Sequence, residues 1–414
     1  MRVVKKRVLV LVVLLTLPIL ASAQLRDRDP DLAGAKKLAG DLQQANFHRG
    51  SFYLLSRFRI SDAGYTESGF LPTGDQGGGL SLTVEAPHRL YFVPRKKTVY
   101  SLEVVPGYSF FKEEERGTQF NYLVRADAHF LLNHVYLNLY ALRADQLRAH
   151  VADLNRLATA RDSEIGLASE IKYSSRTSAL LTARVRDTSY PLNRFQPDPL
   201  PSTQVPVEIL DRQEKNLRLS VLHKTFPRTS FFVAGEASDY DFVNKDAYKS
   251  RRTYVGGGLS YDGGRTQFRL EGGTMKLDFD DPTQPDFTGI GAQARVSRNN
   301  GRWTYSLGAD RDLGFSVFRD NAYYLSTSAN VGVDYITTRK LTLHARSAVE
   351  RDEYDTPVLG QTRTDDISFT SVGFTYGLRR LRFGTDVGWY ERESTAFGDE
   401  ASGIRYVLRL SFTP

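Results

Sequence analysis

Histidine is the residue type in this chain best suited to binding metals or moving protons, and its spacing indicates no site. The chain holds seven histidines and no cysteine. His88, His129 and His344 fall on the polar side of alternating stretches, where a water-filled environment would solvate them. Their separation matches no zinc-ligand spacing, and no Ser/His/Asp arrangement accompanies them. We therefore expect no metal and no catalytic centre.

Two further stretches carry groups that could bind a ligand. The segment 278–287, "DFDDPTQPDF", offers four carboxylates but lacks the spaced oxygen ligands of a calcium loop. The segment 254–261, "YVGGGLSY", has three adjacent glycines, but no helix follows that could receive a phosphate. We interpret the first as a polar surface loop and the glycines as small residues facing lipid or a narrow lumen. No cofactor and no enzymatic activity are expected.

The elements that carry these residues have a period of two. In "NYLVRADAHF" at 121–130 the even positions are apolar, whereas Arg125, Asp127 and His129 occupy odd positions. The same alternation recurs from about residue 51 onward, with about ten residues per stretch, as expected for strands with one apolar and one polar face. Counting these stretches predicts about 18 strands, within a range of 16–18.

Two kinds of connection join the predicted strands. Short, often basic turns are expected at 94–97, 131–134, 174–177, 226–229, 262–266, 298–302, 337–340 and 377–380. Longer polar loops are expected at 190–214, 278–287, 351–363 and 391–400. Short turns at one end and long loops at the other predict an all-β, transmembrane antiparallel β-barrel with periplasmic turns and extracellular loops. Such a closed sheet pairs every backbone group within the hydrocarbon. A secreted propeller is the alternative, but its repeats group four strands.

The first residues predict export. Residues 1–23 combine four basic residues, an apolar run at 8–20 and the small-residue site Ala21-Ser22-Ala23, as in a cleaved signal peptide. Residues 24–50 form a separate N-terminal segment on the periplasmic side, and 51–414 form the barrel. Within 24–50, Leu32, Ala35, Leu38, Leu42 and Ala45 lie at helical spacing. This short amphipathic helix could be a plug, a partner contact or a loosely attached element.

The charge balance excludes one class of partner. The net charge of +7 falls to +3 when the four basic residues of 1–23 are removed, which is too small to indicate nucleic acid. We expect the outer membrane of a Gram-negative bacterium as location. Outer-membrane lipid and the barrel assembly machinery are the expected partners.

The polar faces of the strands predict the lining of the lumen. The basic residues with this parity are Arg57, Arg59, Arg89, Arg125, Lys172, Arg184, Arg186, Arg218, Arg269, Arg295, Arg346, Arg382, Arg405 and Arg409. The acidic ones are Glu85, Glu103, Asp127, Glu170, Glu271, Asp310, Glu350 and Asp386. Because basic residues outnumber acidic ones, the lumen is expected to favour anions. The alternative interpretation is that these charges form ion-pair ladders that solvate the wall.

The stretch "YVLRLSFTP" at 406–414 has the alternation of a final barrel strand. Ile404, Tyr406, Leu408, Leu410 and Phe412 share its apolar face. This pattern resembles the C-terminal insertion signal of outer-membrane proteins, in which the last residue is usually Phe. Here Thr413 and Pro414 follow.

One family resemblance rests on turn chemistry and alternation. "EAPHRLYFVPRKKTVYSLEVVPGYSFF" at 85–111, with "SSRT" at 174–177 and "FPRT" at 226–229, resembles the β-barrel porin-2 family of outer-membrane proteins. Some members are associated with exopolysaccharide export. The resemblance therefore implies a barrel that passes a hydrophilic, anionic solute or polymer, most simply an exported exopolysaccharide, with periplasmic export components as partners. A general diffusion porin and a non-conducting structural or adhesion barrel remain the alternatives.

Overall fold

The computed structural model describes residues 34–66, 79–112, 118–150, 156–191, 206–318, 321–355, 362–395 and 400–414. The predicted signal peptide at 1–23, the beginning of the 24–50 segment and most of the 190–214 loop lie outside these residues. Within the described part of the chain, no helix is long and apolar enough to cross a membrane.

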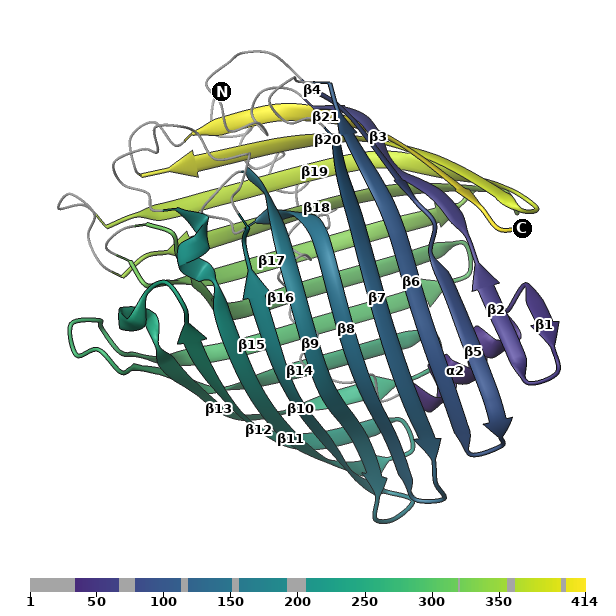
Figure 1. Cartoon of the computed structure of the whole chain (residues 1–414), viewed down its shortest axis with the longest axis horizontal. Coiled ribbons are helices and arrows are strands. Elements are labelled where there is room, and N and C mark those ends of the chain that lie inside the picture. The colour runs from purple at the N-terminus through teal and green to yellow at the C-terminus, as the bar shows by residue number, and fades with distance from the viewer. Residues whose placement is uncertain are drawn as a thin grey trace.

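The structure is an antiparallel barrel preceded by one helix (Figure 1). The elements are α2 (Gly34–Gln43), β1 (Phe47–Arg49), β2 (Phe52–Ser56), β3 (Phe58–Thr66), β4 (Gly79–Glu85), β5 (His88–Arg95), β6 (Thr98–Phe111), β7 (Thr118–Leu131), β8 (Val135–His150), β9 (Arg156–Lys172), β10 (Thr177–Ser189), η3 (Val207–Leu210), β11 (Arg212–Phe226), β12 (Thr229–Phe242), η4 (Asp246–Tyr248), β13 (Ser250–Asp262), β14 (Thr266–Phe279), β15 (Phe287–Asn300), β16 (Trp303–Phe315), β17 (Tyr323–Ile336), β18 (Leu341–Glu353), β19 (Thr364–Leu378), β20 (Leu381–Ser394) and β21 (Ala401–Phe412).

Eighteen strands make the wall, which confirms the predicted fold class. β2 and β3 are two parts of the first strand, β4 and β5 are two parts of the second, and β6 to β21 supply the other sixteen. The second strand is interrupted at Pro87, which has no backbone N–H to donate to a ladder. The first strand is interrupted beside it, at Arg57, whose N–H donates to the Pro87 carbonyl at 3.0 Å.

The barrel closes where β21 pairs with β3. The register runs from Arg405 opposite Thr66 to Phe412 opposite Phe58, with one irregularity between Leu408 and Leu410. Below Phe58 the neighbour of the first strand changes, because the short strand β1 pairs with β2 there. The side chain of Asn46 lies at this junction: it bonds both the N–H and the carbonyl of Ser56 and is 3.4 Å from the Pro414 carbonyl.

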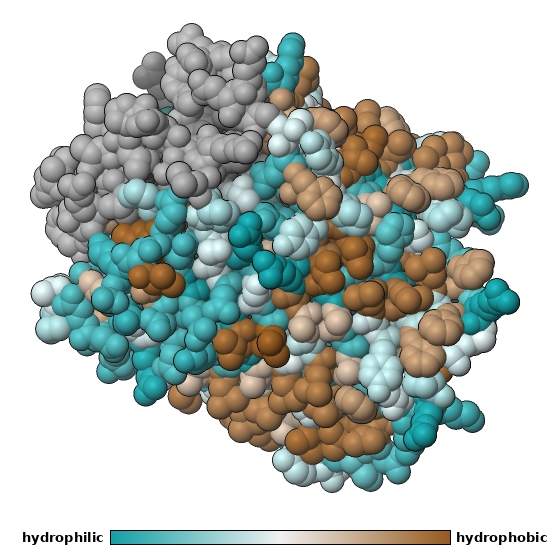
Figure 2. Space-filling model, in the orientation of Figure 1, coloured by the Kyte–Doolittle hydropathy of each residue, from teal (hydrophilic) through white to brown (hydrophobic). Residues whose placement is uncertain are grey.

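The outer face is apolar towards the short turns and polar towards the long loops. On β11, Leu217, Leu219 and Val221 are exposed outward, whereas Lys215 lies outward nearer the long connection. Figure 2 shows apolar side chains gathered over the part of the visible face nearer the short turns. The strands, at 12 to 17 residues for β6–β21, are longer than the ten expected. Since an outer-membrane apolar band is only about 25 Å tall, their charged ends extend beyond it on the extracellular side.

Aromatic residues mark the membrane boundary at the end with the short turns. Phe52 stacks on Phe92 with ring centroids 4.8 Å apart, and Trp303 meets Tyr335 at 4.3 Å. Outward aromatic rings at this level form the girdle seen at the interfaces of membrane barrels. The residues of the predicted insertion signal share the outward face of β21, and Phe412 closes it at this girdle, 40% exposed.

The eight short connections lie at the predicted positions. Three of them use left-handed backbone, at Gly264 with φ +77°, at Gly301 with φ +65° and at Arg379 with φ +41°. Glycine adopts this conformation without steric cost, whereas arginine does so less readily. These turns fix the register of the strands on either side.

The main apolar core lies inside the barrel, towards the long loops. Inward residues near the strand ends, including Tyr240, Phe242 and Tyr354, pack against Val207 of η3 and Phe318 of the β16–β17 connection. These five side chains are at most 3% exposed. The extracellular end of the lumen is therefore narrowed by connections that fold inward.

Candidate functional site in the barrel lumen

The inner wall is defined by side chains that alternate with the exposed apolar residues. On β11, Glu214, Asn216, Arg218 and Ser220 are all buried between outward neighbours, and cross-strand partners continue this inward face around the barrel. No set of three or more metal-binding side chains occurs among the described residues. What the inner wall offers instead is a dense arrangement of ion pairs.

Arg218 is the centre of a deeply buried group of charges. Its guanidinium donates to Glu236 at 3.1 Å and to Glu271 at 2.7 Å, from strands β12 and β14. Arg269 reaches the second oxygen of Glu271 at 3.3 Å and lies over the ring of Phe232, with its guanidinium carbon 4.1 Å from the centroid. Arg218 is only 2% exposed, so this cation is held by protein groups and not by water.

A second group lines β9, β10 and β11. Arg186 donates to Asp162 at 2.9 Å, and Arg184 donates to Glu214 at 3.2 Å. Thr188 adds a hydroxyl to the same Asp162 oxygen at 2.8 Å. The carboxylates are buried, whereas about a quarter of each arginine remains open to the lumen.

A third group lies near the closing seam. Asp386 of β20 bonds His344 of β18 at 2.6 Å and Arg409 of β21 at 2.6 Å. Arg346 pairs with Asp334 at 3.2 Å across β17 and β18. His344 is buried against a carboxylate, unlike the solvated residue expected from the sequence.

The other predicted lumen residues are distributed over the same wall. Arg59 pairs with Glu85 at 2.7 Å and Lys172 with Glu170 at 3.6 Å, while Asp310 accepts from Gln293 and Glu350 from Ser326. Arg57, Arg295 and Arg382 are exposed, and Arg405 is half-buried. The predicted set is thus several separate groups around the barrel and not one convergent site.

Sequence reasoning missed charged residues close to the extracellular end. Arg252 pairs with Asp312 at 2.6 Å, and Asp365 receives hydrogen bonds from both Arg363 and Arg392. All of them have inward parity, but they lie beyond the ten-residue stretches counted from the sequence. Extending the alternation to the full strand length would have found them.

The missed residues change the charge balance of the lumen. Acidic partners such as Asp162, Glu214 and Glu236 were absent from the predicted lining, yet they neutralise predicted arginines. The excess of positive charge is therefore smaller than the sequence suggested, and much of it is compensated within the wall. The ladder interpretation describes these groups better than a row of free cations.

The helix α2 lies against the inner wall at the end with the short turns (Figure 1). Leu38 is 6% exposed and packs with Tyr91 of β5 and Val99 of β6. Asp41 accepts hydrogen bonds from Arg89 and from the Tyr91 hydroxyl. Burying a leucine stabilises the docked helix by about 2 kcal/mol, and a partly exposed ion pair adds at most about 1 kcal/mol. The docked position of α2 is therefore only weakly stabilised.

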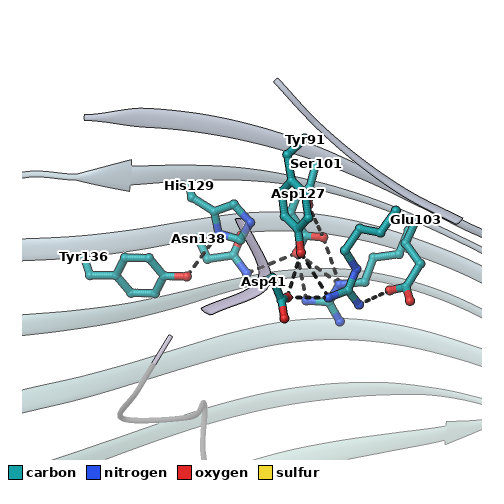
Figure 3. A network of polar contacts seen from close by, with 10 residues as sticks. Asp41, Tyr91, Ser101, Glu103, Asp127, His129, Tyr136 and Asn138 are labelled. Carbon is teal, nitrogen blue, oxygen red and sulfur yellow. Dashed lines mark hydrogen bonds and ion pairs between the residues drawn. The ribbon is translucent and has the colours of Figure 1, made fainter. Parts of the chain in front are cut away.

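The wall beneath α2 carries a network of polar contacts (Figure 3). Arg89 also pairs with Glu103, while on the next strand Arg125 binds Asp127 at 2.9 Å. Asn138 donates to the same Asp127 carboxylate at 3.2 Å. Arg89 and Glu103 thus join β5 to β6, and Asn138 and Asp127 join β8 to β7, at the level where α2 docks.

Known structures share this architecture. The outer-membrane protein OpdK of Pseudomonas aeruginosa is 12% identical, with a TM-score of 0.50, over 87% of this chain and 99% of that one. OpdK with vanillate gives 11% identity and a TM-score of 0.53 over 87% and 99% of the two chains. OccAB3 of Acinetobacter baumannii gives 9% and 0.50 over 88% and 99%. At these identities the likeness concerns the fold.

The sequence comparisons are more specific about family than about relatives. No curated protein matches the chain. The model of the family described as "Putative beta-barrel porin 2" matches residues 148–411, which include β9 to β20 and most of β21. Together with the closed wall and its polar interior, this match makes the protein a porin-like channel of the outer membrane, and the chain belongs to the β-barrel porin 2 family.

Proposed function

We propose that this barrel exports an exopolysaccharide across the outer membrane. The observation that carries the proposal is the self-compensated inner wall, where arginines such as Arg186 and Arg218 are bound by wall carboxylates. A polymer must make many contacts with the wall and leave each of them again. Conduction of this kind needs sites that are weak and numerous.

Paired charges suit a chain of sugar hydroxyls. An ion pair presents both hydrogen-bond donors and acceptors, and each hydroxyl can do both. A free arginine would instead bind an acidic group strongly and slow its departure. Export would also require periplasmic export components to deliver the chain, and the barrel assembly machinery to insert the protein.

A diffusion porin is the second candidate, and one observation favours it. Phe318 and its neighbours in the β16–β17 connection fold into the lumen and pack with η3. An inward connection of this kind narrows a pore to the size of small solutes. The two functions differ in whether a long chain can pass.

The test is single-channel recording of the refolded protein in a planar bilayer with polysaccharides of graded length. An exporter should show blockades whose duration grows with chain length, when the chains are added at the side of the short turns. Adding them at the other side is the control for simple plugging of the mouth.

Either of two results would overturn export. Blockades that stop growing beyond short oligosaccharides would indicate a diffusion porin. A barrel that never conducts would indicate the structural or adhesion alternative.

A further inference from the structure

We propose that Arg89 and Tyr91 form a carboxylate-binding subsite of the lumen, that Asp41 fills it in the resting barrel, and that an acidic sugar displaces Asp41 and releases α2. The ligand class is a uronate, a sugar whose carboxylate matches the side chain of Asp41. The choice of a saccharide rests on the proposed function, whereas the subsite itself rests on the contacts of the helix.

The geometry is that of a carboxylate acceptor. The same Asp41 oxygen accepts from Arg89 Nη1 at 2.9 Å and from the Tyr91 hydroxyl at 2.7 Å. Arg89 and Tyr91 are alternate residues of β5, so both project from one face of one strand. A charged and a neutral donor converging on one oxygen favour an ionised carboxylate over an uncharged group.

The subsite stays assembled without Asp41. The second terminal nitrogen of Arg89 is bound to Glu103 of the neighbouring strand β6, which holds the guanidinium on the wall. Asp41 and Glu103 bind different terminal nitrogens of this guanidinium, and Figure 3 shows these two carboxylates apart from each other. Of the two carboxylates bound to this guanidinium, only Asp41 comes from an element outside the barrel wall. A ligand carboxylate would take the place of Asp41.

The subsite is open to solutes in the lumen. The side chain of Arg89 is 29% exposed and that of Asp41 is 22% exposed, in contrast to Arg218 at 2%. Arg125 is a poorer candidate, because Asp127 of its own strand occupies its Nε and Nη2. Arg89 is therefore the cation at this level whose partner can be exchanged.

Exchange at this point would loosen the helix. Tyr91 both donates to Asp41 and packs against Leu38, so this wall residue takes part in the polar and in the apolar contact of α2. A ligand carboxylate that takes the two donors removes the polar part of the docking. An acidic polysaccharide would thereby uncover the part of the inner wall on which α2 docks and along which the polymer passes.

The helix can be monitored with a single introduced thiol, because the chain has no cysteine. Leu38→Cys places the thiol in the docked contact, and an uncharged polyethylene glycol maleimide reports how often it is exposed. In proteoliposomes we expect Asp41→Asn to raise the labelling rate about tenfold, as for the loss of one partly exposed ion pair with its hydrogen bond. Galacturonate oligomers should raise the rate without that substitution, and neutral glucose oligomers should not.

Three controls keep the result specific. Asp334→Asn removes the partner of Arg346 on the far wall and should leave labelling unchanged. Gln43→Cys, an exposed position of α2, should label rapidly in every condition. Tyr91→Phe removes one donor and should weaken the response to galacturonate severalfold.

Three outcomes would refute the subsite. An unchanged rate in Asp41→Asn would mean that Asp41 does not hold the helix. A response to Asp41→Asn but not to galacturonate would mean that the helix is mobile without recognising a carboxylate. An equal response to neutral oligomers would indicate displacement by bulk alone. Each leaves the export proposal standing, because the length dependence of the blockades tests it independently.

Discussion

Replacing Arg218 by methionine should be among the most damaging single changes to the inner wall. The change removes a cation that is 2% exposed and leaves Glu236 and Glu271 buried without it. Removing one partner of a buried ion pair costs about 3–5 kcal/mol. Here Glu271 keeps Arg269 at 3.3 Å and Glu236 keeps Asn216 at 3.1 Å, so we expect the lower end, about 3 kcal/mol.

The free energy of unfolding can be measured by urea titration in lipid vesicles. The two tryptophans, Trp303 and Trp389, are 40% and 44% exposed on the outer face and should report loss of the lipid environment. A loss of about 3 kcal/mol corresponds to a more than hundredfold change in the unfolding equilibrium.

Arg251→Met is the matched control for this measurement. Arg251 lies on β13 with an exposed partner, Asp239, at 2.7 Å, and its loss should change stability little. If Arg218→Met lowered the free energy of unfolding no more than this control, the ion pairs of Arg218 with Glu236 and Glu271 would not stabilise the barrel. Adding Glu271→Gln to Arg218→Met should recover part of the loss, because it removes one of the two buried charges.

Three further outcomes follow from the wall. Gly258→Ala should sharply lower the yield of heat-resistant folded barrel on gels, because the Cβ of the alanine would lie 1.9 Å from the Leu270 carbonyl oxygen. Gly272→Ala is the control, because a Cβ at that position meets no atom within 4 Å, and it should leave the yield unchanged. Asn46→Ala should increase protease cleavage near β1 while leaving the barrel intact, since it removes the bonds to Ser56. The reversal potential in a salt gradient should indicate only weak anion preference, and a strong preference would contradict charge compensation.

The alternation of the sequence predicted the wall well, because one physical rule governs every strand. Lipid on one side and water on the other impose a period of two, and tight turns such as the one at Gly301 interrupt it. The second strand, which is interrupted at Pro87, follows the same rule on both sides of the break. The face on which each side chain lies and the order of the strands were therefore predictable.

Partners across the wall were not predictable, because alternation gives the face of a residue and not its height. Arg218 and Glu271 are 53 positions apart and meet only through the register of three intervening ladders. The inward connections were missed for a related reason: Val207 lies in a long polar stretch, yet it is fully buried. Similarly, the helical spacing of Leu38 predicted a helix, but nothing local indicated that Asp41 would meet Arg89.

The position beside the first strand is shared by two segments from opposite ends of the fold. β21 occupies it above Phe58 and β1 continues it below, with Asn46 and the Pro414 carbonyl in contact across 368 positions. A contact of this sequence separation carries a large loop-closure entropy until the ladders between its ends have formed. The Asn46–Pro414 contact can therefore form only late in folding, after β21 has closed the sheet, whereas the pairing of β1 with β2 is local in the chain. The helix that precedes β1 contacts β5 and β6 through Leu38 and Asp41, so this docking does not require the closing seam.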